Sequence, residues 1–164
     1  GPEMKSTGEA MGHGPNFGTA YLKAMKGGNK KLPTKGTVFL SISNKLKLEF
    51  GNIAQELIDL GFNFIATKGT AAHLRKKGIK SKVIWRISDK KQPDILSVMR
   101  RGNVDLIINL PTGRRAATDG AQMRRLAVEL GIPFITTLTG AKAAIDSLKE
   151  GEKDYLKPLK KIKY

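Results

Sequence analysis

The sequence predicts a three-layer α/β/α domain built on a five-stranded, parallel, Rossmann-like sheet. Short blocks of Val, Ile, Leu and Phe recur between residues 37 and 136, and each is followed by apolar residues at helical spacing. Five such units in succession require helices on both faces of a parallel sheet, because every crossover needs a covering helix. The 164 residues suffice for one core but not for two domains of ordinary size.

The N-terminal region is expected to contain a linker and one helix. Residues 1–15 carry Gly, Pro, Ser and Thr without apolar periodicity, as is typical of a linker. Asn16 can cap a helix that ends at Gly27 and Gly28. Its apolar face would hold Phe17, Ala20, Tyr21, Ala24 and Met25.

The first two β–α units are expected between residues 37 and 77. A β-type apolar run covers 37–42, and the helix after it carries Phe50, Ile53, Ala54, Leu57 and Ile58. A second strand is expected at 62–66, and a short helix at 71–77 ends before Gly78.

Three further units complete the expected sheet. Strands are expected at 83–87, 104–110 and 132–136, and the almost unbroken apolar run of 104–110 is typical of a central parallel strand. The helix after the third strand carries Ile95, Val98 and Met99. The helix after the fourth strand carries Met123, Leu126, Ala127 and Leu130, and the last helix carries Ala141, Ala144, Ile145 and Leu148. From Gly151 the chain is expected to be irregular and basic, so the domain is expected at 16–150 and a tail at 151–164.

The composition limits the cellular locations in which the chain is expected. There is no cysteine, so neither disulfides nor thiolate metal sites are available. No apolar run reaches the length of a membrane span, and residues 1–5 lack the features of a secretory signal. We expect a cytoplasmic protein without a membrane partner.

The formal net charge is +16, which raises the hypothesis of nucleic-acid binding. Basic residues occur in every segment, however, and aromatic residues that could stack on bases are not interleaved with them. Solvated helix faces account for most of these charges. Nucleic acid is therefore not the expected partner, and a positive field that attracts a small anion is the preferred interpretation.

Hydroxyl, amide and cationic groups follow the expected strands. In an open parallel sheet, ligands bind beyond the carboxyl ends of the strands, where helix N-termini gather. These groups make a receptor for a phosphate or carboxylate, without a nucleophile that has an obvious base. The candidates are Ser41, Thr67, Lys68, Gly69, Thr70, Arg86, Asn109, Thr112, Gly113, Thr136 and Thr137.

The segment 67–70 is the sharpest part of this pattern, since Gly69 lets the backbone turn and Thr70 brings its amide into a helix start. Simple helix capping is the alternative. Trp85 is expected either in the core or as a wall of the ligand pocket. Asp119 is expected to cap or start the fourth helix, and His73 to be an exposed surface histidine. His13 has no evident partner, and neither histidine has metal-ligand spacing.

Several motifs resemble the C-terminal part of carbamoyl-phosphate synthase large subunits. The segment PEMKSTGEAMG at 2–12 resembles the end of their second ATP-grasp synthetase unit. The segments NFGTAYLKAM, ATKGTA, VDLIINLPTGRRAATDG and IPFITTLTGAKA resemble the methylglyoxal synthase-like allosteric domain that follows it. The resemblance covers almost the whole chain.

The resemblance implies a regulatory role in pyrimidine and arginine biosynthesis. Bacterial members bind UMP as an inhibitor and IMP as an activator-type ligand and contribute to ornithine activation, whereas ureogenic animal members bind N-acetylglutamate. It implies no cofactor in this domain, ATP and Mg²⁺ in the parent synthetase units, and a glutaminase small subunit and the preceding synthetase domain as partners. The parent chain would be an ATP-dependent ligase. The effector contacts implied here are Lys47, Thr67, Gly69, Thr70, Arg86, Asn109, Thr112 and Thr136 or Thr137.

Some positions depart from the family pattern and leave the effector open. Leu110 and Pro111 stand where UMP-regulated members have hydroxyl residues, and Pro111 removes an amide donor. Trp85 resembles a tryptophan of the N-acetylglutamate-binding members. Methylglyoxal synthase activity is a further alternative, but the family's glycine–aspartate pair appears as Lys91–Gln92 and its histidine as Ala116, so that Asp119 alone is retained.

Overall fold

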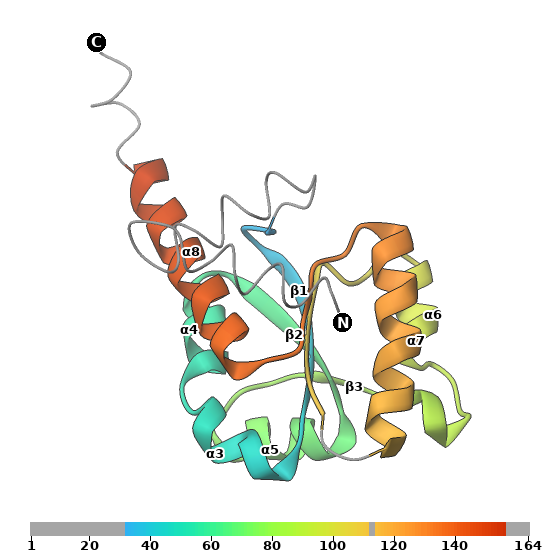
Figure 1. Cartoon of the computed structure of the whole chain (residues 1–164). Coiled ribbons are helices and arrows are strands. Elements are labelled where there is room, and N and C mark those ends of the chain that lie inside the picture. Colours follow the sequence, from blue (N-terminus) through green and yellow to red (C-terminus); the bar gives the residue numbers. More distant parts are fainter. Residues whose placement is uncertain (1–31, 112–113, 157–164) are drawn as a thin grey trace. The chain divides into compact units, whose positions relative to one another are not determined.

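The computed structural model describes residues 32–111 and 114–156 (Figure 1). The expected N-terminal helix and His13 lie outside these residues. The chain divides into two compact units, Pro33–Ala141 and a second made of Gly1–Leu32 with Lys142–Tyr164. The first unit contains the sheet and the candidate site.

A five-stranded sheet forms the centre of the first unit, with all strands parallel and in the order β3-β2-β1-β4-β5. The predicted α/β class is therefore confirmed. The strands are β1 (Gly36–Ile42), β2 (Phe62–Thr67), β3 (Lys82–Ile84), β4 (Leu106–Leu110) and β5 (Phe134–Ile135). Every residue of β4 is buried, as expected for a central strand that is covered on both faces.

Helices cover both faces of this sheet. Figure 1 shows α3 (Lys47–Phe50), α4 (Ile53–Asp59) and α5 (Lys68–Lys76) on one side, and α6 (Ile95–Arg100) and α7 (Arg114–Leu130) on the other. The chain runs outward from β1 to β3 and then returns past β1 to β4. Because parallel crossovers are right-handed, this reversal of direction puts the later helices on the opposite face.

The core on the α6–α7 side is formed by side chains from the sheet and both helices. Phe39 of β1 and Ile107 of β4 pack with Met99 of α6 and with Met123 and Ala127 of α7. Since side chains alternate along a strand, Val38 and Leu40 face the opposite layer, and both are fully buried. The apolar blocks in the sequence thus supply both layers.

The helix expected after the first strand is broken into two. Gly51 has a φ of +53°, which a glycine adopts without a steric penalty, and it separates α3 from α4. The helix expected at 71–77 begins earlier, at Lys68, directly after β2. The second difference puts the first turn of α5 directly at the carboxyl end of β2.

The third strand is shorter than expected, and the prediction of strand at 83–87 is wrong beyond Ile84. The Trp85 backbone N–H donates to the Pro93 carbonyl at 3.0 Å, and Trp85 forms only an isolated bridge with Asp94. Ile87–Asp89 then forms a 3-10 turn, η2. The fifth strand likewise contains only Phe134 and Ile135 of the expected 132–136.

The last helix, α8, spans Leu138–Leu156. The expectation of irregular chain from Gly151 is therefore wrong as far as Leu156. In the second unit, the Ser147 hydroxyl donates to the Ala143 carbonyl one helical turn earlier, at 3.0 Å. None of the helices within 32–111 and 114–156 combines the length and apolar character that a membrane crossing needs.

Candidate functional site

A cleft of about 1040 Å³ lies at the carboxyl ends of the strands. Its walls come from the loop after β1, the start of α5, the segment after β3 and the end of β4. This is the edge at which open parallel sheets bind ligands. The predicted residues that line it are Ser41, Lys47, Thr67, Lys68, Gly69, Thr70, Trp85 and Arg86.

The start of α5 faces this cleft without a side-chain cap. Thr67 has extended backbone angles at the N-cap position, but no side chain accepts a hydrogen bond from the first turn there. Gly69 leaves open space, since a Cβ atom built on it would meet only the Lys47 ammonium, at 3.5 Å. Free backbone N–H groups and the positive end of a helix dipole attract anions. Simple capping by Thr67 is therefore not the role of this segment.

The Thr70 side chain fastens α5 to the end of β1. Its Oγ1 accepts a hydrogen bond from the Ile42 backbone N–H at 2.9 Å and another from the Thr67 hydroxyl at 3.4 Å. Thr70 is only 2% exposed. Its hydroxyl thus has a structural task at the floor of the cleft.

Lys47 places a positive charge over the same helix start. Its Nζ donates to Asn44 Oδ1 at 2.6 Å and to the Gly69 carbonyl at 3.3 Å. Partial burial, together with the nearby charge of Lys76, lowers the pKa of Lys47 from its usual 10.5. Since the cation lacks a carboxylate among these partners, an incoming anion would relieve an uncompensated charge.

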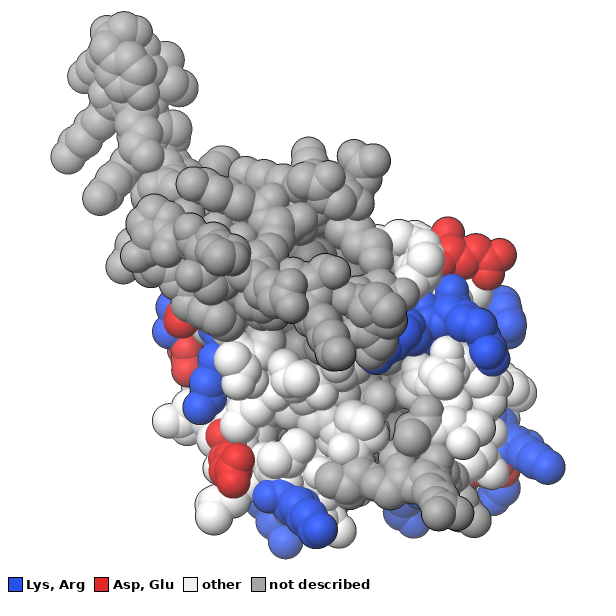
Figure 2. Space-filling model, in the orientation of Figure 1, with Lys and Arg blue, Asp and Glu red and all other residues white. Residues whose placement is uncertain are grey.

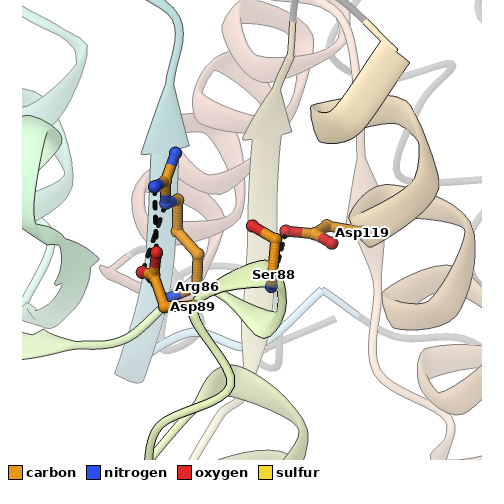
Figure 3. Close-up of polar contacts among 4 residues, drawn as sticks. All are labelled: Arg86, Ser88, Asp89 and Asp119. Atoms are coloured by element: carbon orange, nitrogen blue, oxygen red, sulfur yellow. Dashed lines mark hydrogen bonds and ion pairs between the residues drawn. The ribbon is translucent and has the colours of Figure 1, made fainter.

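Arg86 supplies a second cation, but Asp89 engages it (Figure 3). The guanidinium donates from Nη2 to Asp89 Oδ1 at 2.9 Å and from Nε to Oδ2 at 3.3 Å. The Arg86 backbone N–H also donates to Oδ2, at 3.0 Å. These hydrogen bonds and the opposite charge raise the pKa of Arg86 and lower that of Asp89.

Asp89 lines the cleft and was missed by the strand-end argument, together with Asn44 and Lys45. The spacing of Arg86 and Asp89 could have revealed the first of these. A side chain that bonds a backbone N–H three residues earlier is the pattern of a capping box. Asn44 and Lys45 follow β1 directly, so the strand-end rule extends to them.

The prediction that Asp119 caps or starts the helix after the fourth strand, α7, is wrong. Asp119 is 9% exposed and lies in the second turn of α7, where its Oδ2 accepts the Ser88 backbone N–H at 3.2 Å (Figure 3). The carboxylate therefore ties η2 to α7. This bond holds the turn that carries Arg86.

Trp85 forms part of the cleft wall. It is 38% exposed, and the Lys91 ammonium lies 4.4 Å from the ring centroid. Of the two roles predicted for Trp85, the pocket wall matches its position. An exposed indole face can stack on a planar ligand group.

The other predicted site residues within the described part of the chain do not line this cleft. Asn109 is buried on β4 beside Ser41 of β1, and its Nδ2 has no hydrogen-bond partner in the described part of the chain. Thr137 caps α8, since its Oγ1 accepts the Gly140 N–H at 2.9 Å. Thr136 is half-buried near it. Thr112 and Gly113 lie outside the described residues.

His73 is not the exposed surface histidine that was predicted. It is half-buried on α5, and its Nε2 is buried without a hydrogen-bond partner among the described residues. Burial, then the charges of Lys77, Lys47 and Lys76, lower its pKa from 6.5. The Lys77 ammonium donates to the Gly51 carbonyl at 2.8 Å. This hydrogen bond joins the end of α5 to the break between α3 and α4.

Basic side chains are distributed over the described surface. On the face shown in Figure 2, Lys and Arg lie in separate groups with acidic residues between some of them. The described residues form no continuous basic track on this face. The residues described contain no group of three or more His, Asp or Glu side chains that could hold a metal ion.

Comparison with known proteins identifies the domain type. The family model for the MGS-like domain matches residues 49–136. The carbamoyl phosphate synthase large chain, C-terminal section, of Methanocaldococcus jannaschii is 48% identical over 155 residues, which cover 93% of this chain and 25% of that protein. The corresponding section from Methanopyrus kandleri is 45% identical over 150 residues, covering 91% and 28%.

A bacterial relative gives the same result. The carbamoyl phosphate synthase large chain of Rubrobacter xylanophilus is 44% identical over 149 residues, which cover 91% of this chain and 14% of that protein. The chain thus spans between about a seventh and about a quarter of the length of these relatives. Together with the five-stranded parallel sheet, these matches show that the chain belongs to the MGS-like domain family, in the form carried by carbamoyl phosphate synthase large chains.

Proposed function

We propose that this domain is an allosteric module that binds a small anionic effector in the cleft and does not transform it. The observation that supports this most directly is the meeting of an uncapped helix start with the Lys47 ammonium and the Arg86 guanidinium in one cleft. Such a combination attracts a phosphate or a carboxylate.

A nucleoside monophosphate such as UMP or IMP fits this cleft. The volume of the cleft, about 1040 Å³, lies near the upper end of the range common for small-molecule sites, roughly 300–1,000 Å³. The phosphate would lie at the start of α5, and Trp85 offers a surface for a planar ring. An acylated amino acid of the N-acetylglutamate type is the alternative effector, since its carboxylates could use the same cations.

The regulated reaction belongs to the longer chain that this domain accompanies in its relatives. By that likeness, we infer a cytoplasmic, glutamine-dependent carbamoyl phosphate synthase with ATP and Mg²⁺ in its synthetase units and a glutaminase subunit as partner. An effector that binds two orientations of the domain with different affinity shifts the population between them. The effector would thereby alter the activity of the adjoining synthetase unit.

Catalysis of the methylglyoxal synthase type has weaker support from the site. The one carboxylate retained from that chemistry, Asp119, accepts the Ser88 N–H and ties η2 to α7. Ala116, which stands where methylglyoxal synthases have a histidine, has no titratable side chain. A test for methylglyoxal release from dihydroxyacetone phosphate separates this alternative from effector binding.

Calorimetric titration with UMP, IMP, ornithine and N-acetylglutamate in turn tests the proposal. We expect saturable binding of one nucleotide or of N-acetylglutamate, and Lys47→Gln should weaken it about tenfold, because about 1.4 kcal/mol of charge–charge attraction is lost. Lys80→Gln is the matched control, since Lys80 is exposed beyond the far end of α5 and does not line the cleft. Equal losses in both variants, or no binding of any of the four ligands, would contradict the proposal.

A further inference from the structure

An acidic side chain is present among the cations of the cleft. Asp89 is the one carboxylate among the described residues that line it. A negative charge at this position opposes the anion binding that Lys47, Lys68 and the start of α5 favour. Its placement therefore requires an explanation.

The geometry of Asp89 is fixed from several directions. Both of its oxygens accept from the Arg86 guanidinium, at 2.9 and 3.3 Å, and one also accepts the Arg86 backbone N–H at 3.0 Å. The Arg86 side chain remains 53% exposed and the Asp89 side chain 24% exposed, so a ligand in the cleft can reach the pair. The Asp89 carboxylate thus occupies the Nε–Nη2 edge of the guanidinium, one of the two edges that can bind an oxyanion through two hydrogen bonds.

We propose that Asp89 is an internal competitor for Arg86, so that an anionic ligand must displace its carboxylate from the guanidinium in order to bind with full strength. This inference rests on the proposed function of the cleft. It assigns to Asp89 the role of setting the affinity and makes the Arg86–Asp89 pair the contact that changes when an effector binds.

The exchange is physically favourable for a phosphate group. A carboxylate three residues away has a high effective concentration at the guanidinium, so a weak anion gains little by replacing it. A phosphate dianion carries more charge and three acceptor oxygens, and the helix start and Lys47 bind it at the same time. Ligands of this class can therefore displace Asp89.

The turn that carries the pair is held independently of it. Trp85 N–H bonds the Pro93 carbonyl, and Ser88 N–H bonds Asp119 on α7. Release of the Asp89 side chain therefore leaves the backbone anchored just before η2, at Trp85, and at Ser88, the middle residue of η2. The Ser88–Asp119 bond links η2 to α7.

Asp89→Asn tests this inference in the 164-residue chain. The asparagine oxygen can still accept the Arg86 backbone N–H, but it no longer neutralises the guanidinium. Trp85 is the single tryptophan and lines the cleft, so its fluorescence reports binding of UMP. We expect Asp89→Asn to bind UMP about threefold to tenfold more tightly than wild type, as a partly exposed bidentate pair allows. Asp59→Asn removes an equal charge on α4, outside the cleft, and should leave the affinity unchanged.

A double-mutant cycle with Arg86→Gln distinguishes competition from plain repulsion. The gain from Asp89→Asn should be larger when Arg86 is present than when it is absent. Equal gains in both backgrounds, or weaker binding by Asp89→Asn, would overturn the inference. Failure of every variant to bind UMP also counts against it, whereas the four-ligand titration decides separately on the proposed function.

A measurement on the wild-type chain covers the case in which a variant does not fold. Arg86 lowers the pKa of Asp89, and displacement by a ligand removes this partner. The carboxyl-carbon resonance of Asp89 should therefore titrate at higher pH in the presence of saturating UMP. An unchanged titration would show that the pair persists in the complex and would overturn the inference.

Discussion

Thr70 shows how a single hydroxyl group joins two elements at the site. Its Oγ1 accepts the Ile42 N–H at 2.9 Å where β1 ends, and the group is buried. Thr70→Val has nearly the same shape but leaves that N–H without an acceptor. We expect the free energy of unfolding, measured by urea denaturation, to fall by about 1–3 kcal/mol.

Thr70→Ser is the matched control for this prediction. Serine keeps the hydroxyl and loses one methyl group, which costs about 0.8 kcal/mol when fully buried. A loss in Thr70→Val no larger than the loss in Thr70→Ser would mean that the hydroxyl group contributes no more to stability than the methyl group does, and would contradict the prediction.

His73 gives the stability of the chain a defined pH dependence. Burial and three neighbouring lysines hold its pKa in the folded chain below the unfolded value of 6.5. The folded state therefore binds fewer protons, and the stability associated with the neutral imidazole is present above pH 6.5 and is lost as the pH falls below it. Lowering the pH from 7.5 to 5.5 should destabilise the wild type more than His73→Gln.

The melting temperature of both chains at several pH values measures this difference. We expect an excess drop of about 1–2 °C in the wild type, a small effect because the side chain is only half-buried. His13 is common to both chains, so its titration cancels in the comparison. Parallel pH profiles for the two chains would show that His73 does not sense the lysines around it.

At the scale of elements, the junction between η2 and α7 positions the cleft wall. The Asp119 carboxylate accepts the Ser88 N–H at 3.2 Å, and η2 carries the Arg86–Asp89 pair beside it. Asp119→Ala should lower the free energy of unfolding by about 1–3 kcal/mol, because a partly buried N–H loses a charged acceptor. Hydrogen exchange at the Ser88 amide should become faster at the same time.

Asp119→Asn keeps an oxygen acceptor at the same position and should show a smaller change in both measurements. Slow exchange at Ser88 in Asp119→Ala would contradict the assigned tether. The outcome matters for function, because a loosened η2 would place Arg86 less precisely.

The same scale shows where sequence patterns predict elements well and where they do not. The long apolar run at 104–110 and the periodic residues of α7 identify β4 and α7 because burial on a regular element leaves a strong pattern. The end of β3 at Ile84 leaves no such pattern. It depends on a hydrogen bond from Trp85 to Pro93, across a turn whose path only the folded backbone defines.

At the scale of the whole molecule, strand order decides which loops meet. Because β1 lies between β2 and β4, the segments that follow β1, β2 and β3 converge on one cleft. The strand-end rule therefore identified Ser41, the start of α5 and Arg86 among the lining residues. It gave the same weight to Asn109, Thr136 and Thr137, although Asn109 is buried within the sheet and Thr137 caps α8.

The sequence by itself determined the α/β class, the parallel sheet and the edge at which polar groups gather, because these follow from apolar periodicity and from the right-handed crossover. Only the tertiary structure decided which polar atoms are already paired. Asp119 with Ser88 and Thr70 with Ile42 are such pairs. The reason is physical. A hydrogen bond requires its donor and acceptor to be placed to within a few tenths of an ångström, here on segments about 30 residues apart. Residue type and spacing along the chain do not define positions so precisely.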